Sequence, residues 1–110
     1  MDKIKNVGLK VVGVTFTNED GSSRRAIIER MNDSSKVYLV REPNNKYDVN
    51  AIKVYAVDDD GHDGQIGYIG KDYSAILAPM MDMGREFTAA IDDCGIYKDR
   101  PYCNIIVNEK

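Results

Sequence analysis

The sequence contains few of the residues from which metal centres and nucleophilic sites are built. It has no tryptophan, a single histidine and only two cysteines among 110 residues. Cys94, Cys103 and His62 do not form a set with the spacing of a zinc site, and His62 lies in an acidic segment without a recognisable catalytic partner. The glycine-rich phosphate loop of NTPases is also missing. We therefore expect no metal, no cofactor and no enzymatic activity.

Long hydrophobic runs are absent as well. No apolar segment approaches the roughly 20 residues of a membrane-spanning helix, and residues 1–6 lack the apolar core of a secretory signal. We expect a cytoplasmic protein with no membrane partner. If residues 86–94 and 102–108 pair as a hairpin, Cys94 and Cys103 could approach one another. In a reducing compartment we nevertheless expect two buried thiols rather than a disulfide.

The chain also lacks an excess of positive charge. Its net charge is -3, which argues against indiscriminate binding of nucleic acid through a basic surface. The charge is unevenly divided, because residues 1–55 carry ten Lys or Arg against seven Asp or Glu, whereas residues 56–110 carry five against eleven. A polyanion should therefore favour surfaces built by the first half. The length predicts a single domain over residues 1–110.

Hydrophobic alternation and turn residues predict six strands and two short helices. The strands are expected over residues 7–16, 36–41, 50–57, 65–69, 86–94 and 102–108, and the helices over 24–31 and 73–78. Ser22 or Ser23 can cap the first helix and Asp72 the second, and Pro79 should end the second helix or start another turn. A mainly β chain with such tight connections suggests a small, closed or nearly closed antiparallel barrel.

The side chains of the two helices are expected to divide between core and surface. Ile76 and Leu77 should point inward, and the cluster of Met80, Met81 and Met83 should fill the core. The first helix leaves its charged residues for solvent or a ligand, namely Arg24, Arg25 and Arg30. The acidic segment 58–64 does not meet the EF-hand pattern and is interpreted as a solvated hairpin turn.

The loop between the second and third strands has the residue types needed to bind an unpaired DNA end. Tyr47 can stack on a base, Asn44 and Asn45 can each donate and accept hydrogen bonds, and Asp48 can accept one from a sugar hydroxyl. The residues alone leave another interpretation open. In it, the two asparagines are turn residues, Tyr47 belongs partly to the core and Asp48 caps the backbone of its own loop. Asn50 is expected to hold the geometry of the loop.

Several segments, in order along the chain, resemble the HIRAN domain. They are Val11 to Phe16, Glu42-Pro43-Asn44-Asn45 through Asn50-Ala51-Ile52, Ile66-Gly67-Tyr68-Ile69, and Leu77 to Gly84. HIRAN domains occur fused to SWI/SNF-type DNA translocases and as small free-standing bacterial proteins. The resemblance implies an OB-like β-barrel with helices packed on it, which here would be six-stranded. It also implies a reader of single-stranded DNA 3′ ends, with Asn44, Asn45, Tyr47 and Asp48 matching the family's binding loop.

The first strand departs from the DNA-reading eukaryotic pattern. Where that pattern has an Arg-Tyr pair, this chain has Thr15 and Phe16. Phe16 can still stack on a base or can belong to the core, but the phosphate contact is lost unless Arg24, Arg25 or Lys71 restores it.

We therefore expect a non-catalytic module for single-stranded DNA, read at its 3′-hydroxyl end, with repair or replication proteins as further candidate partners. Two alternatives stay open. The first is a protein-interaction or regulatory module that uses the same groove. The second is a small metal-dependent nuclease built from Glu42, Asp48 and Asp58.

Overall fold

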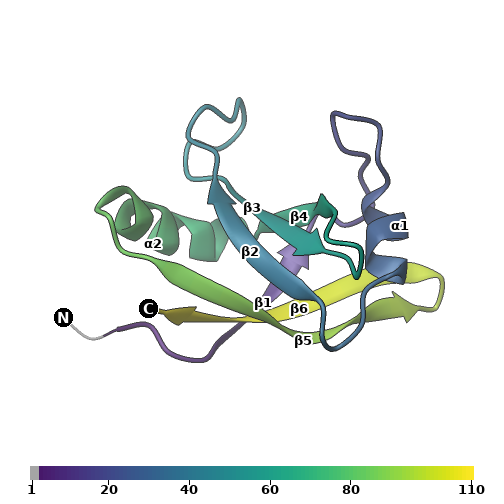
Figure 1. Cartoon of the computed structure of the whole chain (residues 1–110). Coiled ribbons are helices and arrows are strands. Elements are labelled where there is room, and N and C mark those ends of the chain that lie inside the picture. Colours follow the sequence, from purple (N-terminus) through teal and green to yellow (C-terminus); the bar gives the residue numbers. More distant parts are fainter. Residues whose placement is uncertain (1–2) are drawn as a thin grey trace.

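Six antiparallel strands form a closed barrel (Figure 1). The structure is a computed structural model that describes residues 3–110, so the first two residues of the predicted domain lie outside it. The strands are β1 (Val7–Val12), β2 (Lys36–Arg41), β3 (Ile52–Val57), β4 (Asp63–Ile69), β5 (Phe87–Tyr97) and β6 (Arg100–Glu109). Their order around the barrel is β1-β4-β3-β2-β5-β6, and β6 closes it by pairing with β1. The predicted fold class, mainly β with two short helices, is confirmed.

The first strand is shorter than predicted because the backbone turns at Gly13. Gly13 adopts a φ of 72°, a left-handed conformation that suits glycine, and its carbonyl accepts a hydrogen bond from the N–H of Phe16 at 3.2 Å. The predicted bend at this glycine is confirmed, but no strand follows it up to residue 16. The third strand begins at Ile52 rather than at residue 50. Residues 13–16 are thereby released from the sheet to form a loop.

The two helices differ in how well the sequence predicted them. In α1 (Arg24–Glu29), Ser23 caps the N-terminus by accepting a hydrogen bond from the N–H of Ala26 at 3.1 Å. The second helix, α2 (Lys71–Asp82), starts without a side-chain cap and continues through Pro79. The predictions that Asp72 caps this helix and that Pro79 interrupts it are wrong. No helix in the described part of the chain is long and apolar enough to cross a membrane.

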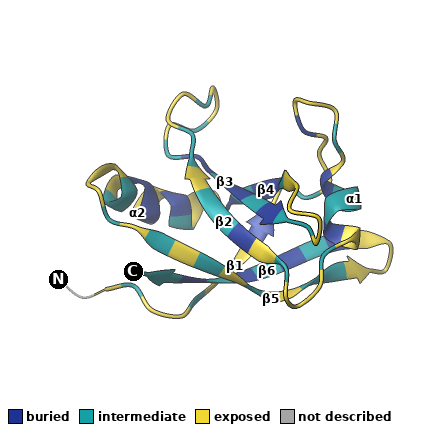
Figure 2. Cartoon of the chain, in the orientation of Figure 1, coloured by how far each residue is buried: buried dark blue, intermediate teal, exposed yellow. Residues whose placement is uncertain are grey.

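The core lies inside the barrel and beneath the two helices (Figure 2). Alternate residues of the strands point inward, and Ile28 and Leu77 add apolar side chains from α1 and α2. Two expectations for α2 are wrong, because Ile76 is 48% exposed and Met83 is 72% exposed. Met81 does pack against the core. Continuation of α2 through Pro79 is favoured because its buried face, Leu77 and Ala78, is fully enclosed.

Two close contacts between strands could not be predicted from local sequence. Cys94 of β5 and Cys103 of β6 are paired directly across the hairpin, with Cα atoms 4.0 Å apart, and form a disulfide. The expectation of two separate thiols is therefore wrong. Next to this hairpin in the barrel order, β4 passes close to β1 at Gly67, where a Cβ atom would lie 2.3 Å from the carbonyl oxygen of Val12. Only a residue without a side chain fits there.

Candidate functional site

Two loops rise from the same side of the barrel (Figure 1). The first loop, residues 13–23, joins β1 to α1, and the second loop, residues 42–51, joins β2 to β3. The second loop is closed at its base, because the N–H of Glu42 donates to the carbonyl of Ala51 at 2.9 Å. Arg41 reinforces this base by donating to the same carbonyl at 3.1 Å and by pairing with Asp82 at the end of α2. The two loops flank the side chains of β3 and β4 described below.

The second loop is held in shape by its own polar side chains. The Oδ1 atom of Asn45 accepts hydrogen bonds from the N–H groups of Tyr47 and Asp48, at 2.8 and 3.0 Å. Asp48 in turn accepts from the N–H of Asn50 at 2.9 Å. Asn45 and Asp48 thus support the loop backbone, as the alternative interpretation of the sequence suggested. Asn44 is exposed, and its side chain makes no hydrogen bond within the described part of the chain.

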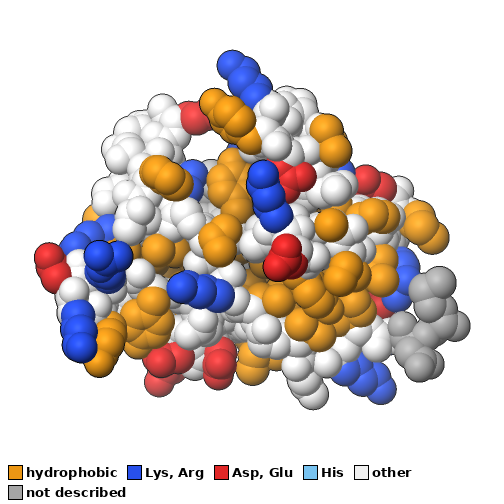
Figure 3. All heavy atoms as spheres, turned by 180° about the vertical axis from the view of Figure 1, so that it is seen from behind, with side chains coloured by type: hydrophobic (Ala, Val, Ile, Leu, Met, Phe, Trp, Pro, Cys, Tyr) orange, Lys and Arg blue, Asp and Glu red, His pale blue; other side chains and the backbone are white. Residues whose placement is uncertain are grey.

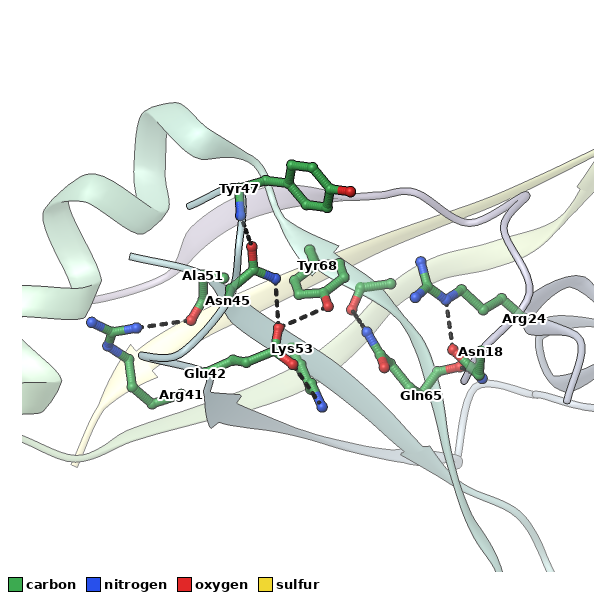
Figure 4. Close-up of polar contacts among 11 residues, drawn as sticks. Asn18, Arg24, Arg41, Glu42, Asn45, Tyr47, Ala51, Lys53, Gln65 and Tyr68 are labelled. Carbon is green, nitrogen blue, oxygen red and sulfur yellow. Dashed lines mark hydrogen bonds and ion pairs between the residues drawn. The ribbon is translucent and has the colours of Figure 1, made fainter. Parts of the chain in front are cut away.

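Glu42 is the centre of the polar network beneath this loop (Figure 4). Its Oε1 atom accepts hydrogen bonds from Asn45 Nδ2 at 2.7 Å and from the hydroxyl of Tyr68 at 2.9 Å. Its Oε2 atom lies 3.0 Å from Lys53 Nζ, and the two side chains are only 16% and 24% exposed. Burial raises the pKa of Glu42, but the hydrogen bonds from Asn45, Lys53 and Tyr68 together hold this pKa below its ordinary value. The carboxylate is therefore charged and fully engaged at neutral pH.

The first loop is tied to the barrel by Asn18, which is 9% exposed. Its Nδ2 atom donates to Ser22 Oγ at 3.0 Å and to the carbonyl of Gln65 in β4 at 2.9 Å. The same loop carries Phe16, which is 67% exposed, so its assignment to the core is wrong. The loop therefore combines a buried polar anchor with an aromatic ring that faces solvent.

The sequence left Arg24 for solvent or a ligand, and the structure contradicts the first of these by burying it. The residue is 7% exposed, and its Nε and Nη1 atoms donate to Asn18 Oδ1 at 2.7 Å and to the Gly13 carbonyl at 2.8 Å. The guanidinium carbon lies 5.4 Å from the centroid of the Tyr68 ring, a cation-π contact. Burial lowers the pKa of Arg24 from its ordinary value. Arg24 thus connects the first loop to the Tyr68 and Glu42 network of the second.

The other predicted phosphate-binding residues lie in more open surroundings. Arg25 is 39% exposed and is engaged by two carboxylates, Glu29 at 2.9 Å and Asp99 at 2.8 Å. Lys71 is exposed at the start of α2. Thr15 is exposed in the first loop, where it lines a hollow of about 600 Å³ between the end of β1 and the β5–β6 hairpin. This hollow includes no residue of the second loop, so Thr15 does not face Tyr47 across it.

Tyr47 is the most prominent side chain of the site. It is 88% exposed, so its assignment to the core is wrong. In Figure 4 its ring projects away from the loop, on the side on which Tyr68 and Arg24 lie in this view. The space-filling view of the opposite face shows apolar and basic side chains intermixed, without one continuous basic surface (Figure 3). The two loops thus each present one strongly exposed aromatic ring, Tyr47 and Phe16.

The residues of the alternative nuclease site are not assembled into a metal-binding group. In the described part of the chain, one group of three potential ligands, Asp58, Asp60 and His62, has ligand atoms within 4.8 Å of one another. Neither Glu42 nor Asp48 belongs to it. The group lies in the β3–β4 turn, where Asp58 Oδ1 accepts from the N–H groups of Asp60 and His62, so the predicted hairpin turn at this position is confirmed.

Sequence reasoning missed the contribution of Glu42 and Tyr68 to the site, and it misplaced Arg24. The available signal was weak. Strand register places Lys53 opposite Val40, two residues before Glu42, so Glu42 reaches Lys53 diagonally from just past the end of β2. Tyr68 lies 26 residues beyond Glu42 in the sequence and comes from β4. Such contacts depend on how strands pair in three dimensions and not on local pattern.

Comparisons with known proteins agree in pointing to one family. The family model of the HIRAN domain matches residues 4–106. Helicase-like transcription factor of Oryctolagus cuniculus is 48% identical over 52 residues, which are 47% of this chain and 5% of that protein. A putative SWI/SNF-related matrix-associated actin-dependent regulator of chromatin of Arabidopsis thaliana is 45% identical over 53 residues, 48% of this chain and 6% of that protein. This chain thus spans about one twentieth of the length of these curated relatives.

Two solved structures share the fold. The crystal structure of the HIRAN domain of human HLTF matches with a TM-score of 0.67 and 23% identity, covering 97% of this chain and 76% of that one. A protein from Lactobacillus plantarum matches with a TM-score of 0.73 and 20% identity, covering 97% of this chain and 92% of that one. At these sequence identities the structural matches support the barrel fold and nothing further. Because the family model extends over almost the whole chain, and the closed barrel agrees with it, this chain belongs to the HIRAN domain family.

Proposed function

We propose that this HIRAN domain is a non-catalytic module that binds single-stranded DNA, and prefers its 3′-hydroxyl end, in the space between the two loops. The observation that carries the proposal is the exposure of two aromatic side chains on these loops, 88% for Tyr47 and 67% for Phe16. Exposed rings held on well-anchored loops offer stacking surfaces for bases. Each stacked base contributes about 1–3 kcal/mol, largely independently of sequence.

The polar residues of the second loop would act on the sugar and phosphates of the bound strand. Asp48 uses one oxygen for the loop backbone, and its other oxygen can accept from a terminal sugar hydroxyl. Asn44 is free to bind the ligand, whereas Asn45 positions the loop because both ends of its amide are engaged. Thr15 at the hollow and Lys71 at the start of α2 are further candidate contacts. Arg25 would have to leave its carboxylates first.

The relatives agree with a DNA ligand, since they are named as a helicase-like transcription factor and a regulator of chromatin. We propose that residues 1–110 act as one domain and that this domain binds DNA in the cytoplasm. Repair or replication proteins are its candidate partners there. The net charge of -3 predicts weak binding, in which local contacts outweigh the overall field.

A second candidate is a module that recognises a protein through the same surface. It is favoured by Val49, which is 68% exposed and adds an aliphatic side chain to the loop that carries Tyr47. Neighbouring exposed apolar side chains are typical of protein-interaction sites. A protein ligand would not give the salt dependence of a phosphate chain, so the two candidates can be separated in one assay.

The experiment is fluorescence anisotropy with labelled single-stranded oligonucleotides at several salt concentrations. Tyr47→Ala should weaken binding by roughly ten-fold or more, the lower part of the range for one stacked base. The fold should remain intact, because the side chain is almost fully exposed. Met83→Ala, which removes another strongly exposed apolar side chain at the end of α2, is the control and should bind normally. No binding by the wild type, or equal binding by the Tyr47 variant, would reject the proposal.

A further inference from the structure

Arg24 is a buried cation that no carboxylate contacts directly, although Glu42 attracts it from a longer distance. Its donors go to two neutral oxygens, Asn18 Oδ1 and the Gly13 carbonyl, and its guanidinium packs on Tyr68. No carboxylate among the described residues lies within ion-pair distance of it, although the chain contains 18 Asp and Glu. Burial of a charge is costly unless the charge is paired. The neighbouring Arg25 shows the contrast, since it is more exposed and is paired with two carboxylates.

The third nitrogen of this guanidinium has no partner among the described residues. Nη2 makes no hydrogen bond, and no described side-chain nitrogen or oxygen is both buried and without a partner. Nη2 therefore reaches solvent, although Arg24 as a whole is 93% buried, the complement of its 7% exposure. The position is also rigid, because its other two nitrogens are held at 2.7 and 2.8 Å. The result is a fixed cation with one donor group that is in contact with solvent and makes no hydrogen bond.

Arg24 also lies beside one of the two exposed aromatic rings. The Arg24 Nη1 atom and the ring of Phe16 lie 3.1 and 3.5 Å from the point that a Cβ atom on Gly13 would occupy. The Gly13 carbonyl accepts hydrogen bonds from both residues, from Phe16 N–H and from Arg24 Nη1. A base stacked on Phe16 would thus carry its phosphate close to the guanidinium. A cation and a stacking surface side by side match the alternation of phosphate and base along a strand.

We propose that Arg24 is the anion-binding position beside the first loop and that it takes a tetrahedral phosphate, in particular a phosphodiester of the bound strand. This rests on the proposed function for the identity of the ligand, but the anion site itself can be tested without nucleic acid. A guanidinium suits it because its planar array of donors matches the oxygens of phosphate. Arg24 would supply, from α1, the positive charge for a phosphate that the uncharged Thr15 lacks.

The first experiment measures thermal stability in phosphate against chloride at equal ionic strength. Phosphate at ten times its Kd should raise the Tm of the wild type by roughly 5 °C for a domain of this size. Arg24→Gln should lose this increment. Arg30→Gln removes the same charge from an exposed residue at the C-terminal end of α1 and should keep the increment. A wild type that responds equally to both anions, or an Arg24 variant that keeps the increment, would overturn the proposal.

A second measurement covers the case in which Arg24→Gln does not fold. In the wild type, the side-chain Nε–H resonance of Arg24 should shift in a saturable way as inorganic phosphate is added, while that of Arg30 should not. Equal, non-saturating shifts of both resonances would show screening alone and would refute the site. This test needs no variant and no DNA.

Two oligonucleotides then separate the anion site from the proposed function. An oligothymidylate should lose roughly 0.7 from its salt slope when Arg24 is replaced by Gln, the value for one phosphate contact on a single strand. If an abasic chain of equal length binds as tightly as the oligothymidylate, and in the same Arg24-dependent way, the anion site stands and base stacking fails. If the oligothymidylate binds with the same slope and affinity to both proteins, DNA binding stands and the Arg24 site fails.

Discussion

Replacement of Glu42 by Gln is the sharpest test of how the second loop is held. Glu42 is the common acceptor for Asn45, Tyr68 and Lys53. Glutamine has almost the same shape, so it removes the charge and one accepting atom while the packing stays nearly unchanged. The amide can still accept from Asn45 and Tyr68, but its NH₂ group then faces the ammonium of Lys53. If the amide is flipped, its oxygen can accept from Lys53, but its NH₂ group then faces the donors of Asn45 and Tyr68.

The size of the effect follows from these contacts. A hydrogen bond to a charged group contributes about 1.5–3 kcal/mol and a neutral one about 0.5–1.5 kcal/mol. Breaking a fully buried ion pair costs about 3–5 kcal/mol. Because the side chains of Glu42 and Lys53 are still 16% and 24% exposed, water can partly solvate the Lys53 ammonium when its partner is lost. We therefore expect Glu42→Gln to lower the free energy of unfolding by about 2–3 kcal/mol, below the range for a fully buried pair.

Urea unfolding of Glu42→Gln and of Tyr68→Phe measures this directly. Tyr68→Phe removes one hydrogen bond to the charged Glu42 but keeps the ring under Arg24, so it should cost about 1.5 kcal/mol, the lower end of the range for a bond to a charged group. The double variant should lose less than the sum of the two, because both changes remove the same hydrogen bond. A loss below about 0.5 kcal/mol for Glu42→Gln, which is the usual range for surface substitutions, would refute the view that this carboxylate supports the loop.

Three further predictions concern the barrel, its acid stability and the reading of DNA ends. Gly67→Ala should lower the free energy of unfolding by about 3 kcal/mol or more, because its Cβ would meet a backbone oxygen of β1. Gly8 has open space around it, so Gly8→Ala should change the free energy of unfolding by no more than about 0.5 kcal/mol in the same urea experiment. The hydrogen bonds from Arg85 lower the pKa of Glu109 from 4.5 to about 2, so its contribution to stability is complete above pH 4.5 and is lost as the pH falls toward 2. The Tm difference between wild type and Glu109→Gln should therefore shrink over that interval, and parallel Tm curves would contradict the assignment. Finally, a phosphate at the 3′ end of the strand should weaken binding by more than the roughly 1.5–3 kcal/mol of one charge-assisted hydrogen bond, and Asp48→Asn should reduce this penalty. Equal affinities for 3′-hydroxyl, 3′-phosphate and 5′-phosphate strands would exclude recognition of the 3′ end.

The strands could be predicted because their signal is local. Alternating apolar residues identified all six strands, and β2 was predicted at its observed ends, Lys36 and Arg41. The boundary errors occur at residues that are compatible with two backbone conformations. Gly13 could have bent a continuing strand, but its φ of 72° ends β1 at Val12. Pro79 could have stopped a helix, but the packing of α2 against the core outweighs the loss of one hydrogen bond.

The site was predicted less completely, because its energetics depend on neighbours distant in sequence. The exposed loop and its aromatic residue follow from local turn chemistry and from the resemblance to the HIRAN family, which is confirmed. The burial of Arg24 could not be predicted from local sequence, because it requires the first loop to fold back beside β4, where Asn18 anchors it. The disulfide is a similar case. Only the β5–β6 register places Cys94 opposite Cys103.

The pairing of the first and last strands has a consequence for how such a domain can be used. Residues at the two ends bond to each other, because the N–H of Glu109 donates to the carbonyl of Ile4 at 2.8 Å and the N–H of Ile4 donates to the Glu109 carboxylate at 3.1 Å. A unit whose entry and exit points lie together can be inserted into a surface loop of a host protein without separating the segments on either side. The same pairing means that the barrel closes only after the last strand has been synthesised. Contacts across more than 100 residues of sequence slow folding, so a host protein with this insertion would have to tolerate an unclosed barrel during its synthesis.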